Sequence, residues 1–312
     1  MLNIKSKSNG PNLPFVRSFS GHETFPFRSS WLKKGVDSVN KDPNIFQRED
    51  AVVKFGVGKN MVQSIRHWCI ATRVVEDLAN GDTGLSSTLL GNKLFTDDGW
   101  DPYLEDDASL WLLHWNLSSK GTRAATWYWA FNQFSEFAFT RRSMSEALLR
   151  DINNGDWAKV SESTIKRDID CFILTYLPRR DTKTDIEDAI GCPLTGLKIL
   201  LQEPDSDRTR FNIGPKDSLP SEIFAFALCE FWIKKNHGGK TLDLREIMRS
   251  EGSPSTVFKL DQDSVLAYLD QLEKITGGKI QFQDTPLVRQ VINRDLSIQN
   301  PLFLLENYYG HG

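Results

Sequence analysis

The chain has 312 residues, 39% of them hydrophobic and 25% charged, which is ordinary for a soluble globular protein of two or three domains. A formal net charge of −3 excludes a basic field over the whole molecule, so any contact with nucleic acid must come from local clusters. The four cysteines form no CxxC pair and no apolar run reaches membrane-spanning length. We therefore expect a cytoplasmic protein with free thiols, no zinc site and no membrane partner.

Residues 1–14 are polar and contain glycine and proline, which predicts a flexible N-terminal segment. In the aromatic-rich segment that follows, His22 and Glu23 lie in a turn-like sequence and Arg28 adds positive charge. Imidazole and carboxylate groups carry protons and bind metals, so His22, Glu23 and Arg28 are candidate catalytic residues. One histidine and one glutamate do not make a metal site, and a polar turn that caps the next helix is the alternative interpretation.

The segment Arg48–Val75 has the pattern of a helix-turn-helix. An apolar-periodic stretch ends at Phe55, and Gly56 allows a sharp turn because glycine tolerates positive φ. A second helix is expected to begin near Lys59, with an apolar face and an opposite face of amides and cations. Such a polar face can meet phosphates and base edges, although an ordinary helical hairpin has the same pattern. The candidate DNA-binding residues on this face are Lys59, Asn60, Gln63 and Arg66.

The region from Glu76 to Leu94 contains a strong turn signal followed by an amphipathic piece, so helix, turn, helix and hairpin follow in winged-helix order. The next stretch is the most acidic in the chain and includes Asp97, Asp98 and Asp101. Closely placed carboxylates can hold Mg²⁺, which orients water in metal-dependent nucleases. These three residues are therefore candidate metal ligands and Mg²⁺ is a candidate cofactor. The alternative is local, since Asp106 or Asp107 can cap the helix that follows.

The aromatic-rich sequence from 111 to 139 predicts buried helices, with His114 as a core histidine. The segment Thr140–Tyr176 resembles a second helix-turn-helix, in which Ser143 and Glu146 have the spacing of a capping box and Ser161 caps the later helix. The outward side of that helix supplies further candidate DNA contacts, against the alternative of a charged solvent face. These candidates are Thr164, Lys166 and Arg167.

A polar stretch from Pro178 to Asp188 predicts a linker, followed by short apolar pieces that pair as strands and by helices that end in an alternating strand. This last part also resembles a small winged-helix module. The predicted fold is mainly α with small β wings, an α+β protein of tandem helix-turn-helix or winged-helix-like modules. The expected divisions are a flexible segment 1–14, a winged-helix-like domain 15–115, an aromatic-rich helical region 116–180 and a C-terminal α+β domain 181–312.

Several phrases in order are specific to one family: FSGHETFPFR at residues 19–28, GVGKNMVQSIRHW, DDGWDPYLED, LWLLHW, VSESTIKRD, FNIGPKDSLP and VFKLDQDSVLAYL. From Phe15 to Arg294 the chain resembles a bacterial family long described only as a domain of unknown function. Its members lie beside genes for DNA phosphorothioation, and the SspB-like component of the single-strand phosphorothioation system belongs to it. The resemblance assigns no catalytic residue by motif.

The resemblance implies a DNA-binding component of a phosphorothioate modification and phage-defence system that nicks one strand of DNA for sulfur incorporation. It implies double-stranded DNA as a partner, together with cysteine desulfurase, ATP-pyrophosphatase-like and ATPase components. No nuclease motif accompanies it in the sequence. The alternatives are a non-catalytic winged-helix DNA-binding adaptor or transcriptional regulator, and a protein-interaction scaffold that fits the slightly acidic net charge.

Overall fold

The computed structural model describes residues 18–78, 83–120, 123–155, 157, 159–178, 191–236, 239–294 and 297–310. The predicted flexible segment 1–14 and most of the predicted linker lie outside these residues. The described chain is mixed α and β, mainly helical with three small antiparallel sheets, which agrees with the predicted α+β class. No helix among the described residues combines the length and the apolar character that a membrane crossing requires.

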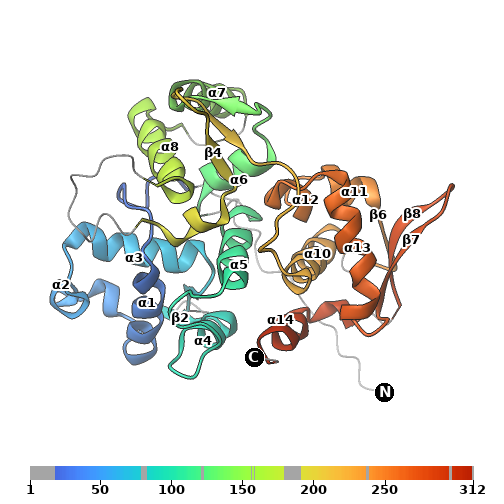
Figure 1. The fold of residues 1–312 in the computed structure, drawn as a ribbon. Helices are drawn as coiled ribbons and strands as arrows, with labels where there is room; N and C mark the ends of the chain where they lie inside the picture. The colour runs from blue at the N-terminus through green and yellow to red at the C-terminus, as the bar shows by residue number, and fades with distance from the viewer. Residues whose placement is uncertain are drawn as a thin grey trace, which may run out of the picture.

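The N-terminal region, blue to cyan in Figure 1, places its helices around a short hairpin. Its elements are α1 (Ser29–Lys41), the 3₁₀ turn η1 (Ile45–Gln47), α2 (Ala51–Phe55), α3 (Lys59–Ala71), β1 (Val75–Asp77), β2 (Leu85–Ser87) and α4 (Leu89–Phe95). The predicted turn is confirmed, because α2 ends at Gly56 in the left-handed conformation with φ of 63°. The second helix begins at Lys59, as the sequence predicts.

The middle region joins apolar helices to a three-stranded sheet of order β3-β5-β4. Its elements are α5 (Asp107–Ser118), α6 (Ala125–Asn132), β3 (Ala138–Phe139), α7 (Arg141–Asn154), α8 (Glu162–Tyr176), η2 (Pro193–Leu197), β4 (Leu200–Gln202) and β5 (Thr209–Phe211). The predicted pairing of the two short strands after residue 197 is confirmed, since β4 and β5 are antiparallel partners. The expected boundary between residues 115 and 116 falls inside α5, and the domain division stays a prediction.

Two of the predicted helix caps are confirmed and one is wrong. Asp106 caps α5 and Ser161 caps α8, each accepting a hydrogen bond from a backbone N–H of the first turn. The capping box before α7 pairs Thr140 with Ser143, whereas the sequence predicted Ser143 with Glu146. Thr140 has an extended backbone and is the N-cap residue, so α7 begins at Arg141, earlier than the sequence predicted. Glu146 forms an ion pair with Arg142 instead.

The C-terminal region, orange to red in Figure 1, combines three longer helices and two short ones with a sheet of order β6-β8-β7. Its elements are α10 (Ser221–Asn236), β6 (Thr241–Asp243), α11 (Leu244–Arg249), α12 (Pro254–Phe258), α13 (Gln262–Ile275), β7 (Ile280–Asp284), β8 (Arg289–Asn293), η3 (Ser297–Gln299) and α14 (Leu302–Tyr309). The sequence indicated β7 but missed β8, its partner along the whole hairpin.

One hydrophobic cluster runs through all three regions. Helices α5 and α10 are apolar around most of their circumference and lie at its centre, as buried helices do. The four cysteines are free and buried. His114 is confirmed as a core histidine, because its Nδ1 lies 2.8 Å from the Tyr176 hydroxyl and its Nε2 lies 2.9 Å from the Val257 carbonyl oxygen.

Candidate nucleic-acid interface

Helix α3 is amphipathic and presents its predicted polar face to solvent. Its apolar side chains Val62, Ile65 and Trp68 are buried in the core. On the other side Lys59, Asn60 and Gln63 are exposed, and the α3 sequence contains no acidic residue. A helix of this kind offers ammonium and amide groups that can contact phosphates and base edges.

Arg66 continues this polar face toward the hairpin that follows the helix. Its side chain is 34% exposed, and a guanidinium nitrogen lies 3.7 Å from a carboxylate oxygen of Asp77 in β1. The same carboxylate also accepts a hydrogen bond from Arg123 at 2.9 Å. Two arginines therefore share one exposed acid, which leaves positive charge available at this end of α3.

The candidate DNA contacts of helix α8 also face solvent, but acidic residues lie beside them. Lys166 and Arg167 are exposed and Thr164 is partly exposed. The Lys166 ammonium lies 2.6 Å from Glu162, and its hydrogen bond and charge lower the pKa of the Glu162 carboxyl. Asp170 on the same helix receives a hydrogen bond of 2.6 Å from Arg141. The α8 face is therefore mixed in charge, unlike the α3 face.

The two helices lie on the same side of the molecule, and the turn containing His22 connects them (Figure 1). The buried carboxylate of Asp168 in α8 lies 2.7 Å from Nε2 of His22 and accepts hydrogen bonds from the Ser20 N–H and the Thr126 hydroxyl. On the other side, the Ser64 hydroxyl of α3 donates to the His22 carbonyl at 2.9 Å. The turn thus fixes α3 relative to α8 through buried polar groups.

Both ring nitrogens of His22 are occupied. Nδ1 accepts a hydrogen bond of 3.0 Å from the Thr24 N–H, so Nε2 carries the proton and donates to Asp168. The side chain is 2% exposed, which keeps water and large substrates away from the ring. This geometry gives His22 a positioning role, and proton transfer to a DNA substrate would require the turn to open.

The other two candidate catalytic residues lie nearer the surface. Glu23 is exposed and has a positive φ of 49°, as do its neighbours Ser20 and Thr24 at 67° and 69°. Non-glycine residues in this conformation cost on the order of 1–3 kcal/mol each, and such strain gathers at functional sites. Arg28 is partly buried, with its guanidinium carbon 5.7 Å from the centre of the Trp31 ring.

A second histidine borders the same turn and was missed as a candidate by the sequence interpretation. His67 of α3 packs so closely on Gly21 that a β-carbon there would lie 2.3 Å from the imidazole Nδ1. Its Nε2 is buried and has no hydrogen-bond partner. Burial lowers the pKa of His67 to about 3 and keeps it neutral. The sequence gave no signal for this contact, because the close approach depends on Gly21, which lies far from His67 along the chain.

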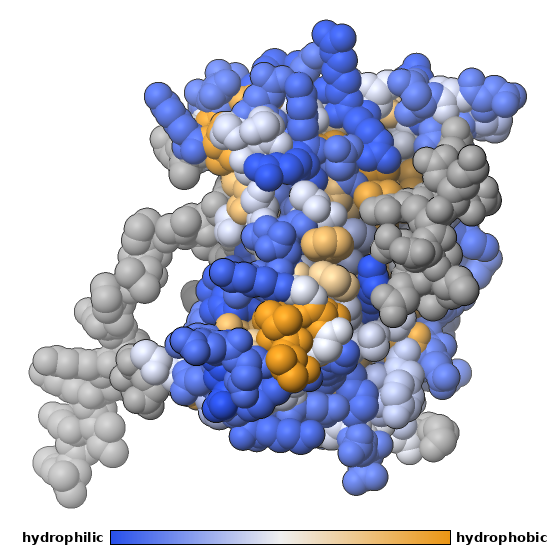
Figure 2. Space-filling view, turned by 90° about the vertical axis from the view of Figure 1, so that its left-hand side faces the viewer, coloured by the Kyte–Doolittle hydropathy of each residue, from blue (hydrophilic) through white to orange (hydrophobic). Residues whose placement is uncertain are grey.

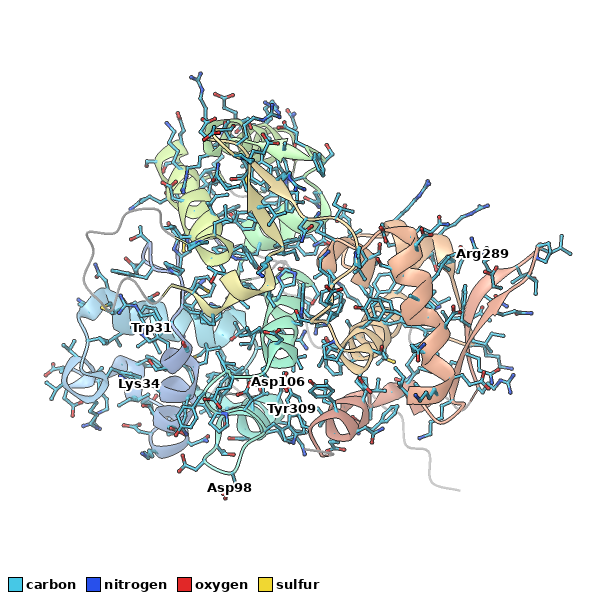
Figure 3. All side chains as sticks on the ribbon, in the orientation of Figure 1. Trp31, Lys34, Asp98, Asp106, Arg289 and Tyr309 are labelled. Carbon is cyan, nitrogen blue, oxygen red and sulfur yellow. The ribbon has the colours of Figure 1, made fainter. Side chains whose placement is uncertain are left out.

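The three candidate metal ligands are not brought together. Asp97 is exposed and forms a 2.8 Å ion pair with Lys33. Asp101 is buried, and its two oxygens accept backbone hydrogen bonds from Glu105 and Asp106 at 2.9 and 3.1 Å. Asp98 lies at the edge of the molecule (Figure 3). Each carboxylate therefore has a separate local environment.

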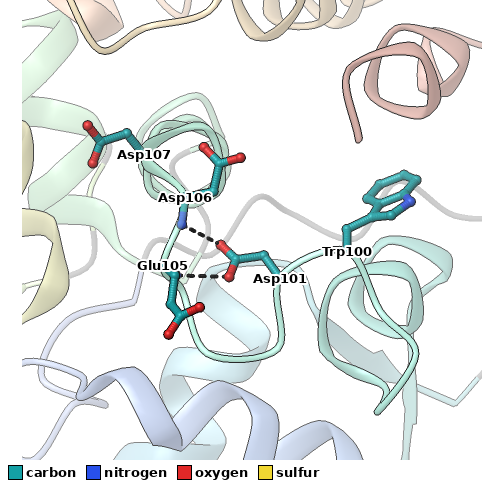
Figure 4. A pocket seen from close by; sticks show the side chains of 5 residues that line it. All are labelled: Trp100, Asp101, Glu105, Asp106 and Asp107. Atoms are coloured by element: carbon teal, nitrogen blue, oxygen red, sulfur yellow. Dashed lines mark hydrogen bonds between the residues drawn. The ribbon is translucent and has the colours of Figure 1, made fainter. Parts of the chain in front are cut away.

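An acidic pocket of about 580 Å³ lies beside Asp101 and is lined by Trp100, Glu105, Asp106 and Asp107. Figure 4 shows that these carboxylates point in different directions around the start of α5. Among the described residues, no three His, Cys, Asp or Glu side chains are grouped so that they could hold a metal ion. The residues predicted as ligands therefore do not fit a shared Mg²⁺ site.

Comparison with known proteins agrees with the resemblance seen in the sequence. The chain is similar to two solved structures, an SspB crystal structure at 28% identity and a magnesium ion-bound SspB crystal structure at 27% identity. In each case the TM-score is 0.85, and the match covers 94% of this chain and 88% of the other. No curated protein sequence matches. Residues 19–309 match the family described as protein of unknown function DUF4007, so this chain belongs to the DUF4007 family.

Proposed function

We propose that this protein is the DNA-binding component of a bacterial DNA phosphorothioate modification and phage-defence system. The observation that carries the proposal is that the polar faces of α3 and α8 are both solvent-exposed and are held together by the buried contacts of His22. In the proposal, Lys59, Arg66 and Arg167 contact backbone phosphates, while Asn60 and Gln63 reach base edges. The α1-to-β2 segment acts as a winged-helix module in this interaction.

The proposal includes nicking of one DNA strand so that sulfur can be incorporated. The exposed Glu23 carboxylate lies in a strained turn between the two helices, where it can take the proton of an attacking water. The water oxygen bonds to phosphorus as the bond from phosphorus to the leaving sugar oxygen breaks, and the leaving oxygen takes a proton from solvent water to become a hydroxyl. Arginine and lysine side chains stabilise the charge that develops on the phosphate oxygens. The proposed partners are double-stranded DNA and the cysteine desulfurase, ATP-pyrophosphatase-like and ATPase components of such a system.

Supercoiled plasmid tests both parts of this proposal. We expect relaxed circles to form with the wild type, assayed with and without Mg²⁺, and to be lost in Glu23→Gln while DNA retention on a gel is kept. Glu49→Gln is the matched control, since Glu49 is also an exposed glutamate but lies outside the turn. Nicking that survives Glu23→Gln would show that another residue is the general base. Loss of nicking only in Asp98→Ala would place the catalytic site at the acidic stretch.

A non-catalytic DNA-binding adaptor or transcriptional regulator is the second candidate function. It is favoured by the occupied ring nitrogens of His22, which leave this histidine without a free proton acceptor. Salt-sensitive DNA retention without relaxation of the plasmid, under every metal condition, would support this alternative. The absence of DNA retention even at low salt would contradict both candidates and leave a scaffold role.

A further inference from the structure

Two exposed apolar sites lie at opposite ends of the molecule. On α2, at the left of Figure 1, Val53 is 82% exposed and Val52 is 39% exposed. At the tip of the β7–β8 hairpin, at the right, Leu287 is 95% exposed and Val288 is 40% exposed. Figure 2 shows the face that carries α2, where an apolar patch is surrounded by hydrophilic residues. Side chains as exposed as Val53 and Leu287 gain most from burial against a partner.

The surroundings of these two sites carry opposite charge. The α2 patch adjoins the α3 face, whose cations are Lys59 and Arg66, and Lys54 lies next to Val53. Two acids precede the patch in the chain: Glu49 is exposed, and Asp50 is already paired with Arg48 at 2.7 Å and lies 3.5 Å from Lys54. This end of the molecule therefore presents an apolar patch with a positive border along α3.

The hairpin end has an apolar tip beside an acidic helix. The turn is closed by hydrogen bonds between Thr285 and Val288, which leave Leu287 projecting from the tip. Helix α13 packs against β7, and its exposed charges are mostly negative. The exposed charged residues of α13 are Asp263, Asp270, Glu273 and Lys274. An acidic helix repels DNA phosphates and attracts a basic protein surface.

We propose that the α2–α3 end of one copy of this chain docks on the β7–β8 and α13 end of a second copy. Leu287 of one molecule would pack on Val52 and Val53 of the next, while the α13 acids face the α3 cations. The two surfaces differ, so the contact is heterologous and leaves a free α2 patch and a free hairpin tip on every dimer. Assembly then continues head to tail.

The size and the charge of the contact set its expected behaviour. The apolar centre is small, so association is weak and depends on charge attraction. The screening length falls from about 30 Å at 0.01 M salt to about 3 Å at 1 M, so salt should dissociate the assembly. Because the docked copy covers the α3 face, assembly would compete with any ligand of that face, including DNA under the proposed function. The docking itself does not depend on that function.

Sedimentation velocity of the full chain at low salt tests the docking. We expect concentration-dependent oligomers that dissociate in 1 M salt, and monomers for both Val53→Asp and Leu287→Asp. Each variant keeps one intact surface, so a mixture of the two should recover a dimer by joining the hairpin of Val53→Asp to the α2 patch of Leu287→Asp. Leu89→Asp changes an apolar side chain that is 63% exposed on α4, and should associate as the wild type does.

Three results would overturn the docking: a monomer at every concentration at low salt, oligomers unchanged by either variant, or a mixture that stays monomeric although the single variants abolish association. Circular dichroism of each variant confirms that the surface change leaves the fold intact. A wild type that assembles but retains no DNA would contradict the proposed function alone. Wild-type DNA retention with no self-association would contradict the docking alone.

Discussion

Helices α3 and α13 occupy similar places in their regions and have opposite surfaces. Each follows a short helix that ends at a residue in the left-handed conformation, Gly56 before α3 and Lys259 before α13, and each precedes a two-stranded hairpin. Each buries one apolar face. On the solvent side α3 has cations and amides and no acid, whereas α13 has three acids and one lysine.

This difference teaches that the order of elements does not by itself indicate what a module binds. The fold requires only the apolar faces, since these pack into the core. The outward residues are free to change, and their charge decides whether a phosphate backbone or a basic protein is attracted. Even the two turns differ, because the Lys259 ammonium is directed inward, where it donates to the Phe131 carbonyl at 2.7 Å and lies 4.3 Å from the Phe211 ring centre.

The largest expected effect is a loss of stability when the buried hydrogen bonds that hold α3 in place are removed. Asp168→Ala removes the acceptor of His22, Ser20 and Thr126 and leaves buried donors unpaired, which should lower the free energy of unfolding by about 3–5 kcal/mol. Urea denaturation measures this loss. Asp170→Ala, an exposed acid on the same helix, should change stability by less than about 0.5 kcal/mol. Equal losses of unfolding free energy in the two variants would show that the buried hydrogen bonds of Asp168 contribute no more to stability than an exposed acid does.

A second measurement concerns Lys259 and Lys216, two lysines in turns that precede α13. Burial lowers the pKa of Lys259 to about 7 and that of Lys216 to about 8, from 10.5 in an unfolded chain. The unfolded state therefore binds more protons above pH 7, and the cost of burying the charge declines as the pH rises toward 10.5. Relative to Lys259→Met, the wild type should gain on the order of 1–2 kcal/mol of stability between pH 7 and 9.

Urea denaturation at a series of pH values gives this difference, and titrations common to the two proteins cancel in it. A difference that is flat with pH would show that the Lys259 amine keeps its ordinary pKa. A difference that falls as the pH rises would contradict the sign, since it would mean that folding favours the charged lysine.

The third test compares the outward cations directly. Lys59→Ala with Arg66→Ala should weaken DNA binding by roughly tenfold or more and reduce the slope of log affinity against log salt by about two. Lys274→Ala, on the acidic face of α13, should leave both quantities unchanged. Fluorescence anisotropy with a labelled duplex measures both. An equal effect of Lys274→Ala would remove the distinction between the two helices.

The smallest expected effect distinguishes the contribution of α8 to DNA binding from that of α3. Lys166 is already paired with Glu162 at 2.6 Å, so its positive charge is partly neutralised before any DNA approaches. Lys166→Ala should weaken DNA binding by less than about threefold, whereas Glu162→Gln should strengthen it slightly by releasing the lysine. The same anisotropy titration measures these shifts, and a tenfold loss in Lys166→Ala would make α8 the main contact instead.

Local signals predicted much of the fold. Gly56 marked the turn before α3, and Asp106 and Ser161 marked helix starts, because each of these effects depends on residues only a few positions apart. The hydrophobic pattern also identified α10 and α13 and the pairing of β4 with β5. The strand β3 was missed because its partner β5 lies about seventy positions later, so the pairing depends on the tertiary fold. The strand β8 was missed although its partner β7 directly precedes it in a hairpin.

The candidate site was less predictable, because its contacts join distant parts of the chain. The sequence drew attention to His22 but could not show that Asp168, 146 positions later, occupies its Nε2. It also suggested that Asp97 and Asp101 share a metal, although one pairs with Lys33 and the other fixes its own loop. These acids are close in sequence, which suggested a cluster. In the structure, however, the backbone places their side chains in separate environments.

The last helix closes the molecule onto a loop formed two hundred positions earlier. Tyr309 stacks on Trp100 with ring centres 4.8 Å apart, its hydroxyl lies 2.8 Å from that of Ser109, and Glu306 pairs with Lys93 at 2.9 Å. These contacts cover the surface beside α4 and α5 with a stacked ring, a hydroxyl pair and an ion pair. Without α14, the Trp100 ring and the start of α5 would face solvent, so this helix shields an aromatic surface that the N-terminal half of the chain cannot cover alone.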